Sequence, residues 1–345
     1  EEGSEMATPQ LKDAIQTLIQ RQDLSAERAD AACEAIISGA DPCQAAALLV
    51  LLKAKGETPA EIAGMVRAMR RHMLTVNPGV PCIDIVGTGG DGHHTVNIST
   101  AASVVAASCG AVVAKHGNRS VSSMCGSADV LEELGIPLAL EPEAIEKCLK
   151  EAGIAFMFAP GFHPAMKNIV PVRKALGVRT VFNILGPLIN PAQCKRGVIG
   201  VYAPELVPLM ADALHQLGSE LIMVIHCQGL DELAPIGMAT IATVRPSGVE
   251  HSVLDPAGLG FKPCTIADLK GGDRVENAQS LRKVLAGELA GPIADTVALN
   301  AGAGLFVAGC ADSIEQGCHI ARKAIEAGTA LATLEKWIQC ANAST

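Results

Sequence analysis

A short β-branched run followed by a glycine-rich segment constrains the fold of this chain more than any other feature. Residues 83–86 read Ile-Asp-Ile-Val, and residues 87–92 read Gly-Thr-Gly-Gly-Asp-Gly. Glycines let backbone N–H groups surround an anion, and the N-terminus of a following helix favours negative charge. The segment therefore predicts a strand, a phosphate-binding loop and a helix. The polar residues that lead into that helix are Thr95, Asn97, Ser99 and Thr100.

Runs of β-branched residues alternate with helical segments after residue 79, which predicts a mainly parallel central sheet covered by helices. The expected fold class is α/β, with a small all-helical domain and a larger α/β domain. We expect the helical domain over 1–78, completed by 168–190, and the α/β domain over 79–345. The predicted strands are Ile83 to Val86, Val112 to Ala114, Val198 to Val201 and Leu221 to Ile225.

The first 78 residues carry helix signals. Leu11, Ile15 and Leu18 repeat at helical spacing. Three further helices are expected to begin after a capping residue, and two of these have proline at the first helical position. The capping residues are Ser25, Asp41 and Thr58, for helices that run towards Gly39, Gly56 and Met73.

Composition excludes several classes of protein. The 345 residues carry a formal net charge of −9 and are only 2% aromatic. Single-stranded nucleic acid is bound by stacking on exposed rings, and phosphate backbones by basic surfaces, so no nucleic-acid partner is expected. No Asp, Glu, Lys or Arg lies between Asp91 and Lys115, but this stretch lacks leucine and phenylalanine. We interpret it as a buried strand, helix and strand, with no membrane partner.

The twelve cysteines include no C-x-x-C pair, which zinc ribbons and thioredoxin-type centres need. We therefore expect reduced, mostly buried thiols in a soluble intracellular protein. The first residues lack the apolar core of a signal peptide. The expected location is the cytoplasm, or the plastid stroma if a transit peptide has been removed.

A basic segment, Lys115 to Ser120, follows the second predicted strand. The glycines at 87, 89 and 92 formally match a dinucleotide fingerprint, but that site needs an acidic residue after the next strand. Lysine and arginine there favour contacts with further phosphate groups instead. Lys115 would supply a compact positive charge, and the Arg119 guanidinium would supply several N–H donors. A dehydrogenase is therefore a distant alternative.

Asp231 and Glu232 follow the predicted strand over Leu221 to Ile225. Such a pair alone is most often an exposed turn. Beside an anion loop, however, adjacent carboxylates suit Mg²⁺ shared with substrate phosphates. No nucleophile is evident, so the residues predict positioning and electrostatic stabilisation of a phosphorylated substrate. Either Arg173 or Arg179 could clamp a substrate carboxylate. The alternative is a helix end whose cations offset the helix dipole, and the residues favour the two interpretations equally.

The same segments resemble the anthranilate phosphoribosyltransferase family, over nearly the whole chain. The shared motifs are Gly87 to Asp91, Asn97 to Thr100, Lys115 to Arg119, Gly126 to Glu132, Arg179 to Asn183, Gly186 to Leu188, Gly229 to Glu232, Leu299 to Ala303 and Val307 to Gly309. Met124 and Cys125 depart from the pattern, since relatives often have lysine and serine there. The resemblance implies a nucleoside phosphorylase/phosphoribosyltransferase-like fold.

The resemblance also implies the reaction: the phosphoribosyl group of phosphoribosyl pyrophosphate passes to the amine of anthranilate, in tryptophan biosynthesis. Asp91, Lys115 and Arg173 match catalytic positions. Ser99, Asp231 and Glu232 match Mg²⁺ positions, and Gly87, His116, Asn118, Arg173 and Pro187 match anthranilate contacts. The donor positions matched are Gly87, Gly90, Asp91, Thr95, Asn97, Ile98, Ser99, Thr100, Lys115, His116, Gly117, Asn118, Arg119, Ser120, Val121, Ser122, Ser123 and Ser127.

Two further alternatives belong to other functions. A pyrimidine-nucleoside phosphorylase has a similar Lys-His-Gly segment but carries an additional C-terminal domain, for which this chain is too short. A nucleic-acid-binding relative needs an extended basic surface, which a net charge of −9 disfavours. The resemblance further implies a homodimer formed through the helical domain.

Overall fold

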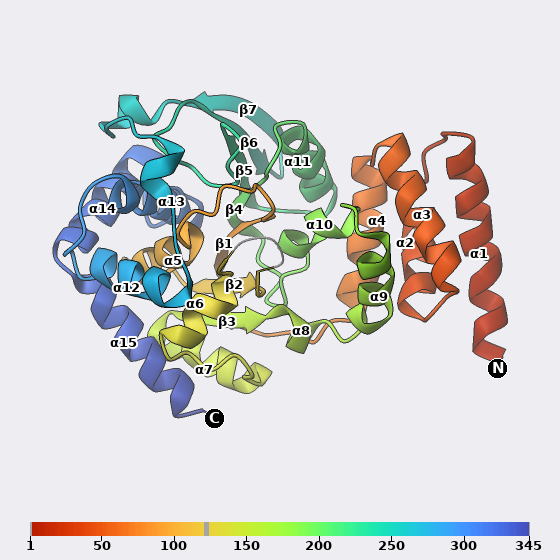
Figure 1. Cartoon of the computed structure of the whole chain (residues 1–345), viewed down its shortest axis with the longest axis horizontal. Coiled ribbons are helices and arrows are strands. Elements are labelled where there is room, and N and C mark those ends of the chain that lie inside the picture. The colour runs from red at the N-terminus through yellow and green to blue at the C-terminus, as the bar shows by residue number, and fades with distance from the viewer. Residues whose placement is uncertain (1, 121–123, 345) are drawn as a thin grey trace.

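The computed structural model describes residues 2–120 and 124–344, with side chains from residue 9 onward. A helical bundle at one end of the molecule lies beside a larger part built around one sheet (Figure 1). The bundle begins with α1 (Glu2–Ile19), α2 (Ala26–Ile37), α3 (Pro42–Lys55) and α4 (Pro59–Arg71).

The predicted caps start these helices. The Asp41 carboxylate accepts hydrogen bonds from the backbone N–H groups of Cys43 and Gln44. Thr58 and Glu61 form a reciprocal capping box at the start of α4. These side chains satisfy N–H groups that have no partner within the helix, so the helix starts are confirmed.

A seven-stranded sheet in the order β3-β2-β1-β4-β5-β6-β7 organises the larger part. The first five strands are parallel, whereas β6 and β7 add on in antiparallel fashion. The sheet is therefore mainly parallel, as predicted. The strands are β1 (Ile83–Gly87), β2 (Val113–Gly117), β3 (Ile154–Phe158), β4 (Arg196–Gly200), β5 (Leu221–Cys227), β6 (Ala239–Arg245) and β7 (Gly248–Leu254).

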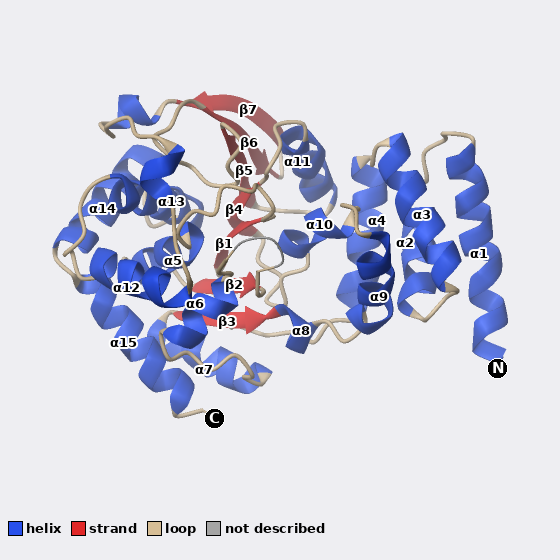
Figure 2. Cartoon of the chain, viewed as in Figure 1, coloured by secondary structure: helices blue, strands red, loops and turns tan. Residues whose placement is uncertain are grey.

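Helices cover both faces of the sheet (Figure 2). The remaining ones are α5 (Ile98–Ser108), α6 (Ser127–Glu133), α7 (Pro142–Ala152), α8 (Ala159–Phe162), α9 (Met166–Leu176), α10 (Phe182–Leu185), η1 (Gly186–Leu188), α11 (Leu206–Gln216), η2 (Pro256–Leu259), η3 (Ile266–Leu269), α12 (Arg274–Leu285), α13 (Pro292–Ala308), α14 (Ile314–Glu326) and α15 (Thr329–Asn342).

Alternating residues of the strands divide the protein into two cores. Met223 and Ile225 of β5 pack with α5 and α13, whereas Ile222 and Val224 pack with α11. The second core continues into the bundle and includes Ile169 of α9. This alternation is expected of strands that are buried on both faces.

Three strands, β3, β6 and β7, lack a counterpart in the sequence analysis. β3 is a five-residue apolar run between a helix and Ala159, too short for periodicity to separate it from helix. β7 is largely exposed and contains glutamate, histidine and serine. It forms by pairing with β6, so its apolar content did not reveal it.

No helix in the described part of the chain combines the length and apolar character needed to cross a membrane. The uncharged stretch after Asp91 forms α5 and the start of β2, both largely buried. The helix and the second strand of the expected buried unit are therefore confirmed, whereas its first strand is wrong: β1 ends at Gly87, and a loop fills the start of the stretch.

Candidate active site

The predicted site residues gather at one edge of the sheet. Because β1, β2, β4 and β5 are parallel, their carboxyl ends meet there, which is where open α/β sheets bind ligands. Gly87 ends β1, and Gly117 ends β2. Asp231 and Glu232 follow β5 by a few residues.

Asp231 is fixed against the glycine-rich loop. Its Oδ2 accepts a hydrogen bond of 2.6 Å from the backbone N–H of Gly89. A Cβ on Gly87 would lie 2.3 Å from the same oxygen, and one on Gly200 would overlap the Asp231 carbonyl. Glycine at both strand ends is therefore what allows this carboxylate to reach the loop.

Glu232, Ser99 and Lys115 meet beside Asp231. The backbone N–H of Ser99 donates to Glu232 Oε1 at 3.2 Å. Lys115 Nζ donates to Ser99 Oγ at 3.2 Å and to the carbonyl of Ile85 at 2.7 Å. Lys115 lies within β2, which pairs with β3 as far as Gly117, so it is a buried strand residue and not part of the loop that we expected.

The acidic pair is buried, contrary to the exposed turn that is usual for such a dipeptide: Asp231 is 7% and Glu232 9% exposed. Burial, and the nearby Asp91 carboxylate, raise the pKa of Asp231 to about 7. Burial, together with Asp231, raises the pKa of Glu232 to about 8. Burial lowers the pKa of Lys115. A cation bound beside Asp231 and Glu232 would stabilise their charged forms and so offset the free-energy cost of burying two carboxylates.

The donor set fits Mg²⁺. Asp231, Glu232 and the Ser99 hydroxyl all offer hard oxygen ligands, which Mg²⁺ prefers. In the described residues, no three His, Cys, Asp or Glu side chains converge to hold a metal by themselves. Mg²⁺ commonly takes one or two protein carboxylates and completes its shell with water and substrate phosphates.

Asn300 of α13 holds the chain just after the acidic pair. Its Oδ1 accepts from the backbone N–H of Leu233 at 3.0 Å, and its Nδ2 donates to the Leu233 carbonyl at 2.7 Å. Asn300 is completely buried. Asn300 therefore helps to fix the backbone next to Glu232.

His116 and His163 form a buried pair on the other side of β2. His116 Nδ1 lies 3.2 Å from the Gly186 carbonyl, and the two Nε2 atoms lie 3.1 Å apart. A carbonyl only accepts, so His116 Nδ1 carries a proton and His116 Nε2 accepts from His163. His163 Nδ1 is then an acceptor, and although it is buried it has no hydrogen-bond partner among the residues that the structure describes.

His163 was missed by the sequence analysis. The signal was a lone polar residue in the Gly-Phe-His-Pro stretch after an apolar run. Its contact with His116 arises because β3 lies beside β2, which only the sheet order reveals. Burial lowers the pKa of His116 to about 3 and that of His163 to about 4, so both rings are neutral at pH 7. Pro187 follows Gly186 in η1, next to His116.

The two candidate arginines have different surroundings. Arg179 donates to the carbonyl of Gly90, and its guanidinium lies 4.3 Å from the ring centre of Tyr202. It therefore braces the glycine-rich loop. Arg173 lies in the last turn of α9, half-buried, and its guanidinium has no hydrogen-bond or ion-pair partner in the described part of the chain. Burial lowers its pKa.

The segment after β2 is held by α6. Arg119 pairs with Asp129 at 2.8 Å and Glu132 at 3.0 Å, so its guanidinium faces carboxylates in this structure. The backbone N–H of Ser120 donates to Asp129. Ser127 Oγ donates to the Asn118 carbonyl at 3.2 Å. Val121, Ser122 and Ser123 lie outside the described residues.

The other donor-site candidates surround the start of α5. Thr95 forms an isolated bridge with Lys270. Asn97 occupies the N-cap position of α5 without a side-chain capping bond, and its amide donates to the Cys125 carbonyl instead. Ile98 and Thr100 are buried within α5. Asp91 Oδ1 accepts from the backbone N–H of His93 at 3.1 Å, which closes the loop after Gly90. Met124 is exposed and Cys125 buried.

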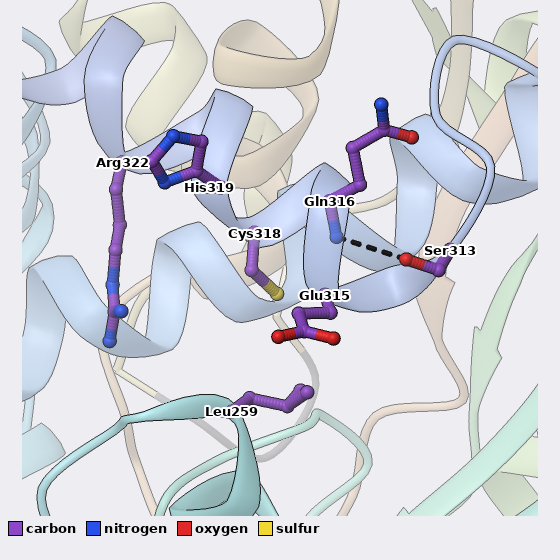
Figure 3. Close-up of a pocket in the computed structure, with 7 residues that line it drawn as sticks. All are labelled: Leu259, Ser313, Glu315, Gln316, Cys318, His319 and Arg322. Atoms are coloured by element: carbon purple, nitrogen blue, oxygen red, sulfur yellow. Dashed lines mark hydrogen bonds between the residues drawn. The ribbon is translucent and has the colours of Figure 1, made fainter.

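A separate pocket of about 370 Å³ lies between η2 and α14 (Figure 3). Its cation is already engaged: Arg322 donates to the Gly260 carbonyl and stacks 3.7 Å from the Phe261 ring centre. None of the predicted site residues lines it, and the pocket adds nothing to the arrangement at the sheet edge.

Fold and site together define a glycosyl transferase with a helical and an α/β part. Residues 12–73 match the family model described as the glycosyl transferase family, helical bundle domain, and residues 79–331 match that of the a/b domain. Among curated relatives, the anthranilate phosphoribosyltransferases of Haloferax volcanii and Roseiflexus sp. are 46% and 47% identical to this chain. The alignments cover 93% and 95% of it and 98% and 97% of those proteins.

Solved structures agree. The anthranilate phosphoribosyltransferase of Thermus thermophilus superposes with a TM-score of 0.91 at 44% identity, over 96% of this chain and 99% of that one. The Saccharomyces cerevisiae enzyme in complex with PRPP and Mg gives 0.88 at 28% identity, over 96% and 98%. The chain belongs to the anthranilate phosphoribosyltransferase family.

Proposed function

We propose that the protein transfers the phosphoribosyl group of phosphoribosyl pyrophosphate to the amine of anthranilate, as a step of tryptophan biosynthesis. The observation that carries the proposal is the contact of Asp231 with Gly89, beside Glu232, Ser99 and Lys115. It joins a cation site to a phosphate loop within a chain whose relatives bear this activity.

The donor is proposed to lie along the loop from Gly87 to Thr100 and the segment from Lys115 to Ser127. Backbone N–H groups of the glycine-rich loop and the N-terminus of α5 attract phosphate oxygens. Asp231, Glu232 and Ser99 would hold Mg²⁺, which when bound neutralises charge on the pyrophosphate. For Arg119 to contact the donor, it would have to give up part of its pairing with Asp129 and Glu132.

In the reaction, the amine nitrogen bonds to the anomeric carbon, the bond from that carbon to pyrophosphate breaks, and the nitrogen loses a proton. The arylamine is a neutral nucleophile at pH 7, so the residues chiefly align it and stabilise charge. Lys115, buried beside Ser99, supplies positive charge towards the departing pyrophosphate. Asp91 orders the loop through its bond to His93.

Anthranilate is proposed to lie between the sheet edge and α9. Its carboxylate suits the unpartnered guanidinium of Arg173, and Asn118 supplies a polar contact. The ring would rest on Gly87, His116 and Pro187. His163 Nδ1, a buried acceptor with no partner, is placed beside His116 to receive an N–H.

The assembly and location are further proposals. We propose a homodimer formed through the helical bundle, which light scattering of the purified protein would test. We propose the cytoplasm or the plastid stroma as the compartment, which fractionation of the source cells would test.

The deciding assay mixes the protein with Mg²⁺, phosphoribosyl pyrophosphate and anthranilate and follows anthranilate fluorescence, with mass spectrometry of the product. We expect fluorescence loss and a phosphoribosyl adduct of anthranilate. Phosphorolysis of thymidine with no anthranilate consumed would reverse the assignment in favour of a nucleoside phosphorylase.

A further inference from the structure

Two thiols lie against each other where β1 and β4 begin. Cys82 Sγ and Cys194 Sγ are 3.2 Å apart, although the residues are 112 positions apart in the chain. Cys82 immediately precedes β1, and Cys194 lies two residues before β4. Cys82 is 7% exposed, and Cys194 is partly exposed.

The backbone is spaced for a disulfide. β1 and β4 are neighbouring parallel strands, with Ile83 opposite Arg196. Continued past the strand ends, this register sets Cys194 one residue out of line with Cys82. A strand spacing of about 4.8 Å and a rise of about 3.3 Å then give a diagonal of roughly 6 Å, within the range of about 4.4–6.8 Å between the Cα atoms of bonded cysteines. An S–S bond measures about 2.05 Å, so the sulfur atoms need to approach by roughly 1 Å.

The surroundings favour a reactive thiol. Arg70 and Cys194 line one small cavity. The Arg70 guanidinium donates to the Leu188 carbonyl and has no acidic partner in the described part of the chain, so its charge is available to a thiolate. The hydrogen bond between the two thiols lowers the pKa of Cys82 and, together with burial, raises the pKa of Cys194 well above its usual range. The Asp84 carboxyl lines the same cavity and opposes ionisation of both thiols, so Cys82 is the one that ionises first.

The pair sits on the connections between the helical bundle and the sheet. Residues 72–82 lead from α4 to β1, and residues 189–195 lead from η1 to β4. The two connections already touch, because the backbone N–H of Val76 donates to the Pro191 carbonyl at 3.1 Å. A covalent bond between Cys82 and Cys194 would tie them together.

We propose that Cys82 and Cys194 are an oxidative modification site that forms an intramolecular disulfide by exchange with a small disulfide such as oxidised glutathione. The Cys82 thiolate attacks one sulfur of the reagent and releases one glutathione thiol. Cys194 then loses its proton and attacks the Cys82 sulfur of the mixed disulfide, which releases the second. The two protein thiols are oxidised, and the reagent is reduced to two thiols.

The test uses the full chain, reduced and then incubated with excess oxidised glutathione. Free thiols are alkylated, and disulfide-linked peptides are identified without reduction. We expect a peptide pair joining Cys82 to Cys194, together with a rise of at least about 5 °C in the unfolding midpoint that a reductant reverses.

Two variants separate this pair from general thiol oxidation. Cys310→Ser removes an exposed cysteine elsewhere and is expected to form the cross-link as the parent does. Cys194→Ser is expected to lose both the cross-link and the rise in midpoint. Full alkylation of Cys82 and Cys194 after the oxidant, or glutathione on one of them with the other still free, would overturn the proposal. A cross-link without a rise in the unfolding midpoint would contradict the inference that the bond ties the two connections together.

Discussion

The backbone N–H of Gly89 donates a hydrogen bond of 2.6 Å to the carboxylate of Asp231. This bond joins a loop after β1 to an acidic pair after β5, 142 residues further along the chain. It places the phosphate-binding and cation-binding parts of the proposed site within one contact. The predictions below test how this contact is built and what it does.

Gly87→Ala is expected to displace Asp231, because the new Cβ would lie 2.3 Å from its Oδ2. We expect kcat/KM to fall at least about tenfold and stability to fall by about 1–3 kcal/mol, as in other overpacked sites. Steady-state kinetics and urea unfolding measure the two effects. Gly258→Ala is the matched control, since nothing lies within 4 Å of its Cβ and its φ is not positive. Equal behaviour of the two variants would contradict the close packing at Gly87.

Asn300→Leu keeps the branched shape of the buried side chain but leaves the N–H and carbonyl of Leu233 without their partner. Unpaired buried backbone groups cost about 1–3 kcal/mol each, so for these two groups we expect a loss of about 2–6 kcal/mol in urea unfolding. We also expect a weaker response to Mg²⁺, because Glu232 loses its support. Gln339→Leu, at an exposed position of α15 whose side chain makes no hydrogen bond in the described part of the chain, is expected to change neither. An unchanged Mg²⁺ response in a folded Asn300→Leu protein would show that the support is unnecessary.

Substitution of Arg173 and of Arg179 is expected to affect the KM values of different substrates. Arg173→Ala should raise the KM for anthranilate at least about tenfold, because the Arg173 guanidinium is the proposed partner of the anthranilate carboxylate. The KM for the donor should change little. Arg179→Ala should act chiefly on the donor, since Arg179 braces the Gly90 carbonyl. Lys174→Ala, exposed beside Arg173, is the control. Equal effects of Arg173→Ala on the KM for anthranilate and the KM for the donor would contradict the proposed contact of Arg173 with the anthranilate carboxylate.

Acid is expected to destabilise the protein through the histidine pair. The pKa values of His116 and His163 are lowered from 6.5 to about 3 and about 4 by burial. As pH falls below 6.5, the unfolded chain binds protons at these rings and the folded chain does not, so their contribution to the free energy of unfolding decreases. Between pH 6.5 and 4, His163→Gln should show a shallower decrease than the parent in thermal unfolding.

His319→Gln, which changes an exposed histidine, should keep the parent slope. Parallel slopes for the parent and His163→Gln would mean that the buried pair does not govern the response to acid.

The site residues could be recognised in the sequence, but the contacts between them could not. The glycine-rich loop, Lys115 and the acidic pair could be predicted, because glycine and charge patterns are local signals. The burial of Asp231 could not, since it depends on glycine at the end of β4, far away in sequence. His163 was missed because its partner His116 lies on a neighbouring strand. Strands β3 and β7 were missed because a short apolar run and an exposed edge carry little periodicity.

Anthranilate fluorescence, measured across a range of Mg²⁺ concentrations, tests the central claim most directly. With phosphoribosyl pyrophosphate present, the parent protein is expected to consume anthranilate in a Mg²⁺-dependent manner. Asp231→Asn, which keeps the shape of the side chain and removes its charge, is expected to need at least about ten times more Mg²⁺ for half its own maximal rate. No anthranilate consumption by the parent at any Mg²⁺ concentration, or the same Mg²⁺ dependence in both proteins, would contradict the account.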